Sequence, residues 1–89
     1  MRRVKAVIYG RVTGVFFRAN IRDRALKLGL KGYVRNLNDK VEAVFEGRKE
    51  VVDKILDFCR KGPLMAKVDK VDVVEEGYKE EFDSFEIRH

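Results

Sequence analysis

The apolar residues near the start of the chain recur first at every second position and then at helical spacing. Over residues 4–10 the alternation predicts a strand with Val4, Ala6 and Ile8 on its apolar face. From residue 17 the period lengthens, which predicts a helix with one apolar stripe made of Phe17, Ile21, Ala25 and Leu28. Gly29 follows where a helix commonly ends with a positive φ angle, so the helix is expected to stop there.

The rest of the chain alternates between the same two patterns. The predicted elements are strands at 31–37 and 41–46, a helix at 48–61, a strand at 68–75, an acidic loop at 76–83 and a short strand from Phe85 to Ile87. Asn38 or Asp39 is expected to supply a left-handed conformation in the turn between the second and third strands. Gly62 and Pro63 end the second helix.

This order predicts an α+β fold, the ferredoxin-like βαββαβ sandwich, in which two helices cover one face of an antiparallel sheet. Right-handed crossovers place both helices on the same side. The first two strands then run parallel with one strand between them, so their C-terminal ends lie at the same edge of the sheet. With no internal linker, residues 1–89 are expected to form a single domain.

The composition is that of a folded, heavily charged domain. Hydrophobic residues make up 45% of the chain and charged residues 39%, which is too apolar for a disordered chain. The net charge of +5 favours anionic partners. It does not by itself choose among phosphate, nucleic acid and an acidic protein.

Some classes of chemistry are disfavoured by the residue types present. No cluster of cysteine and histidine has metal-ligand spacing, so we expect neither a metal nor a cofactor. Cys59 falls in the apolar pattern of the second helix, which predicts a buried, inert thiol. His89, the one histidine, is expected to be mobile as the last residue, which disfavours a histidine nucleophile or base.

The first residues, Met-Arg-Arg-Val, lead straight into a strand pattern, and no long apolar run follows. We therefore expect no signal peptide and no membrane span. A soluble, cytoplasmic monomer is the resulting expectation.

Gly10 and Gly14 bracket the segment between the first strand and the first helix. Glycine adopts backbone angles that side chains forbid, and a tight turn of this kind can point successive N–H groups at an anion. The helix that follows adds free N–H groups and the positive end of its dipole. Arg18 lies in its first turn, and a guanidinium matches the geometry of a phosphate. The segment therefore predicts an anion site.

A plainer interpretation of this segment stays open. Glycines are common where a strand turns into a helix, and an arginine on a helix surface is usually solvated. The spacing excludes a Walker loop and a dinucleotide-binding loop, because neither Gly-Lys-Ser/Thr nor a third glycine follows. Val12, Val15 and Phe16 are expected to anchor the loop to the core.

Two stretches carry a resemblance to a known family. YGRVTGVFFR at residues 9–18 resembles the signature loop of the acylphosphatases, and KGYVRN at residues 31–36 resembles that family's second signature. Residues 41–47 and 61–63 also look like family landmarks, in order and at matching intervals. The resemblance implies the ferredoxin-like fold and metal-free hydrolysis of carboxyl phosphates, the mixed anhydrides of a carboxylic or carbamic acid with phosphate.

The resemblance also implies roles for particular residues. The phosphate-binding arginine falls on Arg18 and the water-orienting asparagine on Asn36. The phosphate-binding loop falls on Arg11, Val12, Thr13, Gly14, Val15, Phe16 and Phe17. The chain departs from the family pattern at Thr13, where glutamine is usual, and in the hairpin after Asn36, which lacks the usual glycine and is a residue shorter.

Two other functions stay open from the sequence. RNA-recognition domains share the predicted topology, but their aromatic series is missing after Tyr33. A regulatory module that binds phosphate or carbamoyl phosphate with weak turnover would use the same loop. We expect no further segment after the domain, which favours a standalone enzyme. We expect this enzyme to take a small acyl phosphate and to release inorganic phosphate. Neither nucleic acid nor a membrane is expected as a partner.

Overall fold

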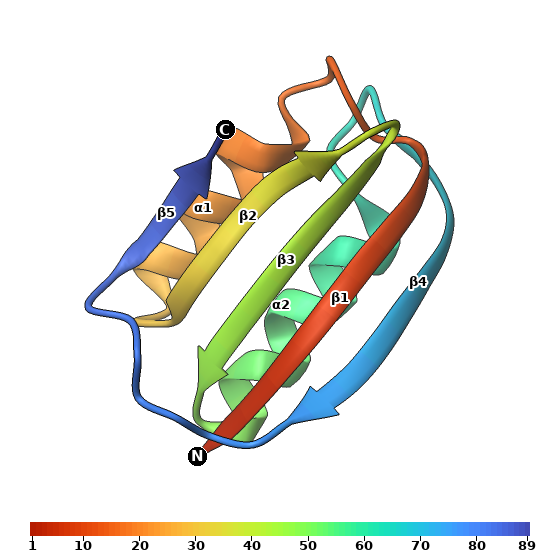
Figure 1. Ribbon diagram of the computed structural model, residues 1–89. Helices are drawn as coiled ribbons and strands as arrows, with labels where there is room; N and C mark the ends of the chain where they lie inside the picture. Colours follow the sequence, from red (N-terminus) through yellow and green to blue (C-terminus); the bar gives the residue numbers. More distant parts are fainter.

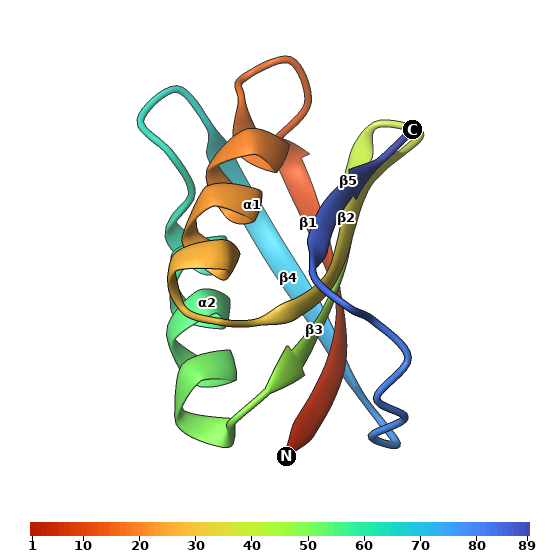
Figure 2. The same cartoon turned by 90° about the vertical axis from the view of Figure 1, so that its left-hand side faces the viewer.

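The computed structural model describes every residue from Met1 to His89 and contains the elements in the predicted order. They are β1 (Arg2–Arg11), α1 (Phe17–Lys27), β2 (Lys31–Leu37), β3 (Lys40–Gly47), α2 (Lys49–Lys61), β4 (Lys67–Glu76) and β5 (Phe85–Arg88). The strands form one sheet, and both helices lie on the same face of it (Figures 1 and 2). Neither helix has the length and apolar character needed to cross a membrane.

The sheet has the strand order β4-β1-β3-β2-β5. Its first four strands are antiparallel to their neighbours, which confirms the predicted sandwich, whereas β5 adds to β2 in the parallel direction. β1 and β2 both run against β3 and are therefore parallel to each other, as predicted. Consequently the C-terminal ends of β1, β2 and β5 all lie at one edge of the sheet, close to the start of α1 (Figure 1).

One hydrophobic core lies between the sheet and the helices. Val4, Ala6 and Ile8 of β1 are fully buried there, as the alternation predicted. The predicted stripe of α1 packs against them, with Leu28 only half-buried at its end. Cys59 lies in the same core, where burial raises the pKa of its thiol to about 12, so the thiol stays protonated and inert at neutral pH.

The turns follow the chemistry of their residues. Asn38 supplies the left-handed conformation, with a φ angle of 60°, in the short turn between β2 and β3. Gly29 has a φ angle of 71° directly after the end of α1. Both positions agree with the sequence-based expectation.

β5 is short and is held mainly by one aromatic side chain. The ring of Phe85 is buried and stacks on the ring of Phe45, with 5.5 Å between the centroids. The backbone N–H of Gly32 donates to the carbonyl of Ser84 at 3.0 Å, which begins the pairing of β5 with β2. The position of the last strand therefore depends on Phe85.

The loop between β4 and β5 is fixed to the uncovered face of the sheet by buried charges. The carboxylate of Glu46 accepts hydrogen bonds from the backbone N–H groups of Lys79 and Glu80, both at 3.1 Å. Arg3, itself buried, forms ion pairs with Glu76 and Glu81. These contacts return the chain to the side of the sheet where β5 pairs with β2.

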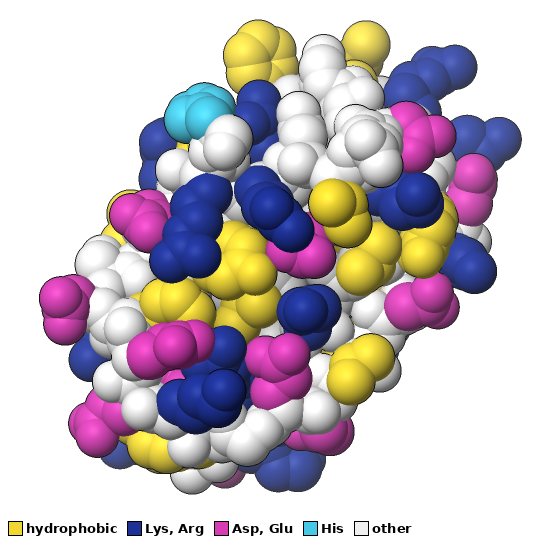
Figure 3. Space-filling view, viewed as in Figure 1, with side chains coloured by type: hydrophobic (Ala, Val, Ile, Leu, Met, Phe, Trp, Pro, Cys, Tyr) yellow, Lys and Arg dark blue, Asp and Glu magenta, His cyan; other side chains and the backbone are white.

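The uncovered face of the sheet carries interleaved basic and acidic side chains (Figure 3). The hydroxyl of Tyr33 donates to Glu42 at 3.0 Å, and its ring lies against Phe82 and under the guanidinium of Arg88. Burial raises the pKa of Glu42, but hydrogen bonds from Arg35 and Tyr33 outweigh it and leave that pKa lowered. A tyrosine engaged in this way offers no free face on which a nucleotide base could stack.

Phe85→Ala is expected to destabilise the protein by about 3 kcal/mol or more, because it removes a buried ring and leaves a cavity beside Phe45. Denaturant unfolding of the variant measures the loss. Val74→Ala is the matched control, since Val74 is 58% exposed on β4. A loss for Phe85→Ala no larger than that of the control would show that the ring does not hold β5.

Candidate active site

The loop that joins β1 to α1 depends on two glycines. Gly10 has a φ angle of 126° at a register shift between β1 and β4, and a Cβ atom there would lie 2.2 Å from the carbonyl oxygen of Lys67. Gly14 has a φ angle of 70°. Side chains rarely tolerate either backbone conformation. Both glycines therefore adopt the positive φ angles that the sequence predicted.

The backbone N–H groups of this loop are left without partners in the protein. None of the N–H groups from Val12 to Arg18 donates to a backbone carbonyl, and the first such donor in the helix is the N–H of Asn20, which bonds to Phe16. No side chain caps the start of α1. A run of free N–H groups at a glycine turn and a helix N-terminus is the arrangement that binds anions.

The apolar residues of the loop behave differently from one another. Val12 is buried and Val15 packs partly against the core, so these two anchor the loop as expected. Phe16 does not, because its side chain is 80% exposed. Its backbone is left-handed, with a φ angle of 60°, and this turns the side chain outward at the start of α1. The expectation that Phe16 anchors the loop was wrong.

Arg18 differs from the other buried and half-buried arginines in having no internal counter-charge. The other arginines that are buried or half-buried each pair with a carboxylate: Arg2 with Asp53 and Glu75, Arg3 with Glu76, Arg22 with Asp23, and Arg35 with Glu42. Arg18 is half-buried and has no such partner. An arginine guanidinium stays charged at any working pH, so an anion from solution can supply the missing counter-charge.

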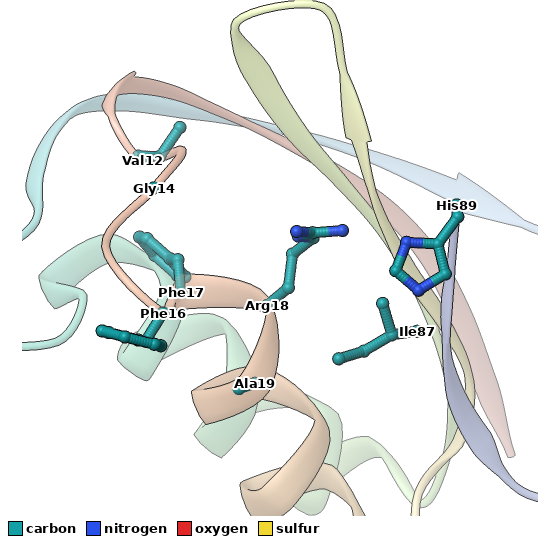
Figure 4. A pocket seen from close by; sticks show the side chains of 8 residues that line it. All are labelled: Val12, Gly14, Phe16, Phe17, Arg18, Ala19, Ile87 and His89. Carbon is teal, nitrogen blue, oxygen red and sulfur yellow. The ribbon is translucent and has the colours of Figure 1, made fainter.

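Arg18 projects into a pocket of about 250 Å³ between the loop and β5 (Figure 4). The pocket is lined by Val12, Gly14, Phe16, Phe17, Arg18, Ala19, Ile87 and His89. No acidic side chain is among them, and the volume suits a phosphate group with a small substituent. The charge and the shape of the pocket thus favour a small anion.

The pocket residues that the sequence analysis missed are Ala19, which follows Arg18 on α1, and two residues at the end of the chain, Ile87 and His89. Ile87 belongs to β5 and His89 follows its last residue, and the imidazole of His89 faces Arg18 across the pocket (Figure 4). The sequence disfavoured a histidine nucleophile or base because His89 was expected to be mobile as the last residue, and the expectation did not place His89 beside Arg18. The signal that pointed the other way is the alternation of Phe85 and Ile87, which continues to residue 89 on the same side of the strand.

Asn36 lies at the end of β2 with its side chain exposed. It is two residues after the buried Val34 and so shares the sheet face that the helices cover. In the register of β2 and β5, Val34 pairs with Ile87. Two residues further along, Asn36 and the pocket residue His89 follow on the same face. Asn36 itself is not among the residues that line the pocket.

The other predicted loop residues lie around the pocket rather than in its wall. Arg11 is exposed at the end of β1, where it pairs in register with Lys67. Thr13 and Val15 are half-buried and do not line the pocket. The structure thus brings Val12, Gly14, Phe16, Phe17 and Arg18 together and leaves Arg11, Thr13 and Val15 at the margin.

Comparisons with known proteins agree on one family. The Acylphosphatase family model matches residues 4–87. The chain is 52% identical to an acylphosphatase of Syntrophus aciditrophicus, covering 98% of this chain and 92% of that one, and 51% identical to an acylphosphatase of Aeropyrum pernix, covering 98% and 88%. The crystal structure of the acylphosphatase from Bacillus subtilis superposes with a TM-score of 0.94 at 30% identity, covering 100% of both chains.

Phe16→Gly is expected to be more stable than Phe16→Ala by about 1 kcal/mol, because only glycine adopts the left-handed conformation at low cost. Both variants remove the same exposed ring, so their difference isolates the backbone angle. Thermal or denaturant unfolding of the pair provides the comparison. Equal stabilities would mean that residue 16 is not held at a positive φ angle.

Proposed function

The chain belongs to the acylphosphatase family, and from this premise we propose that Arg18 and the loop before it bind the phosphoryl group of the substrate while Asn36 orients the attacking water. The protein hydrolyses acyl phosphates, which are split at the carboxyl-phosphate bond into a carboxylate and inorganic phosphate. The observation that carries the proposed roles is the half-buried, unpaired guanidinium of Arg18 beside a run of free N–H groups.

Phosphate binding needs donors and positive charge at one point. The phosphoryl oxygens accept hydrogen bonds from the N–H groups between Val12 and Arg18, and the guanidinium of Arg18 contacts them from the side of α1. The positive end of the α1 dipole adds to the same potential. We extend the loop to Arg11, Thr13 and Val15, as the family resemblance implies, with Arg11 supplying charge at the margin of the pocket.

The chemistry explains why few groups suffice. The leaving group is a carboxylate whose conjugate acid has a pKa of about 4, so no general acid is needed to expel it. Phosphoryl transfer passes through a loose transition state in which the protein contributes positioning and charge stabilisation. Arg18 and the N–H groups provide the charge stabilisation that a metal ion supplies in other phosphoryl-transfer enzymes, so the reaction proceeds without one.

Asn36 contributes positioning. Its side-chain amide carries both a donor and an acceptor, which allows it to hold a water molecule in line with the bond that breaks. The parallel arrangement of β1 and β2 supports this role, because the two strands end at the same edge of the sheet. The proton of the attacking water passes to a phosphoryl oxygen of the substrate.

The remaining proposals concern the setting of the enzyme. The substrate is a small acyl phosphate, and residues 1–89 act as one catalytic domain. We propose that the protein works as a cytoplasmic monomer without a nucleic-acid or membrane partner. The interleaved charges on the uncovered face of the sheet support this, because they form neither a basic stripe nor a large apolar patch (Figure 3).

Arg18→Ala is expected to lower kcat/KM for benzoyl phosphate or acetyl phosphate by about a thousandfold or more, since it removes both binding and charge stabilisation. Arg18→Lys keeps the charge but not the two-pronged contact, and it should recover only about a tenth of the loss or less. The assay is run in excess EDTA. Arg24→Ala, which removes an exposed arginine from the same helix, is the control.

Wild-type activity in Arg18→Ala would overturn the proposed role of Arg18. Phosphate binding without turnover in the wild-type protein would indicate a regulatory module.

Asn36→Ala is expected to lower kcat about a hundredfold, because the attacking water is no longer held in line. Phosphate does not need that water to bind, so its inhibition constant should stay within about threefold of the wild-type value. Lys31→Ala removes an exposed side chain at the other end of β2 and serves as control. Normal turnover in Asn36→Ala would contradict the water-orienting role.

A further inference from the structure

The last strand brings a titratable side chain to the pocket of Arg18. His89 reaches the pocket from β5, whereas Arg18 reaches it from α1 (Figure 4). We propose that His89 is a second contact for the bound dianion, with its imidazolium form donating a hydrogen bond to a phosphoryl oxygen that Arg18 also binds. This inference rests on the proposed phosphate site, and it makes the affinity of that site depend on pH.

His89 directly follows Arg88, the last residue of β5 that pairs with β2, so the paired strand ends immediately before it. Val34 pairs with Ile87, and Arg35 pairs with Arg88. Side chains alternate along an extended chain, so Ile87 and His89 share the side that faces the pocket. Arg88, between them, covers the ring of Tyr33 on the opposite side. Asn36 and His89 are the residues that follow the last pair of this register, Arg35 with Arg88.

The charges around the pocket leave the imidazole free to interact with an anion. No aspartate or glutamate side chain lines the pocket, and Arg18 is its only other charged side chain. The neighbouring residue on β2, Asn36, is neutral. On the surrounding elements Arg22 pairs with Asp23, Arg35 with Glu42, Lys40 with Asp39 and Arg88 with Glu86. The exposed Arg11 at the end of β1 and the exposed Arg24 of α1 form no ion pair, and both carry a permanent positive charge.

A histidine at such a position couples anion binding to proton uptake. Histidine is the side-chain type that ordinarily changes its charge between pH 5 and 8. A bound dianion stabilises the imidazolium form, and by reciprocity the imidazolium form binds the dianion more tightly. Affinity is therefore expected to be higher at the acid end of that pH range than at its alkaline end. Arg18 stays charged throughout and contributes no such dependence.

Sulfate is the suitable probe, because it remains doubly ionised across this range whereas inorganic phosphate does not. Calorimetric titration of the wild-type protein should show sulfate binding about tenfold more tightly at pH 5.5 than at pH 8. His89→Gln should bind sulfate weakly and equally at both values. His89→Lys carries a permanent charge and should bind it tightly at both, a rescue that a merely structural role of the imidazole would not produce.

Arg88→Gln is the matched control, since it removes one positive charge from the adjacent residue, on the opposite side of β5. It should keep the pH dependence of the wild type. Persistence of that dependence in His89→Gln would overturn the role of His89 while leaving the phosphate site intact. Failure of sulfate to bind at any pH, or binding that survives Arg18→Ala, would instead overturn the proposed phosphate site itself.

Steady-state kinetics provide an independent test of the proposed contact between His89 and the substrate. A contact made equally with substrate and transition state changes KM and leaves kcat nearly constant. His89→Gln should therefore raise KM for acetyl phosphate several-fold at pH 6 with little change in kcat. A fall in kcat at constant KM would overturn this binding role and would indicate that the imidazole takes the proton from the attacking water.

Discussion

The site depends on a positive charge that has no counter-charge inside the protein. Elsewhere the structure neutralises the arginines that are buried or half-buried, as it does for Arg3 among Glu46, Glu76 and Glu81. Around Arg18 the chain places apolar side chains and free N–H groups, and no acidic residue lines the pocket. A carboxylate there would neutralise the guanidinium and compete with every anion from solution. The unpaired charge of Arg18 is therefore a condition for the proposed binding of phosphate. It stays unpaired because none of the side chains that line the pocket is acidic.

The fold contributes by collecting strand ends. β1 leads into the loop, β2 carries Asn36, the proposed water-orienting residue, and β5 carries Ile87 and is followed by His89. All three strands end at one edge of the sheet because they are mutually parallel. β5 has only four residues, so its pairing with β2 is marginal without further contacts. The stacking of Phe85 and the fixing of the preceding loop by Glu46 supply these contacts on opposite faces of the sheet. Residues far from the pocket thus determine which side chains reach it.

Local patterns in the sequence predicted most of this architecture. The alternation of Val4, Ala6 and Ile8 and the helical stripe from Phe17 fixed which faces are buried, and glycines marked the turns. The loop and Arg18 were recognisable because anion binding needs glycine, a helix start and a guanidinium close together in sequence. The direction of β5 was not recognisable, because a four-residue strand can pair on either side of a sheet edge and depends on long-range contacts. The outward turn of Phe16 was missed for a similar reason, since an apolar residue type does not reveal a left-handed backbone.

The start of α1 shows how stability and binding compete for the same atoms. Helices are commonly capped by a serine, threonine or aspartate whose side chain accepts the first free N–H groups, and such a cap contributes about 1 kcal/mol. Here residue 16 is a phenylalanine in a left-handed conformation, no side chain caps the helix and its first turn holds no acidic residue. A capping oxygen would occupy N–H groups that the proposed phosphate needs, so the bound anion takes the place of the cap. Anything that binds the native state alone stabilises it, so in the proposed site the substrate or its phosphate product would stabilise the uncapped start of α1.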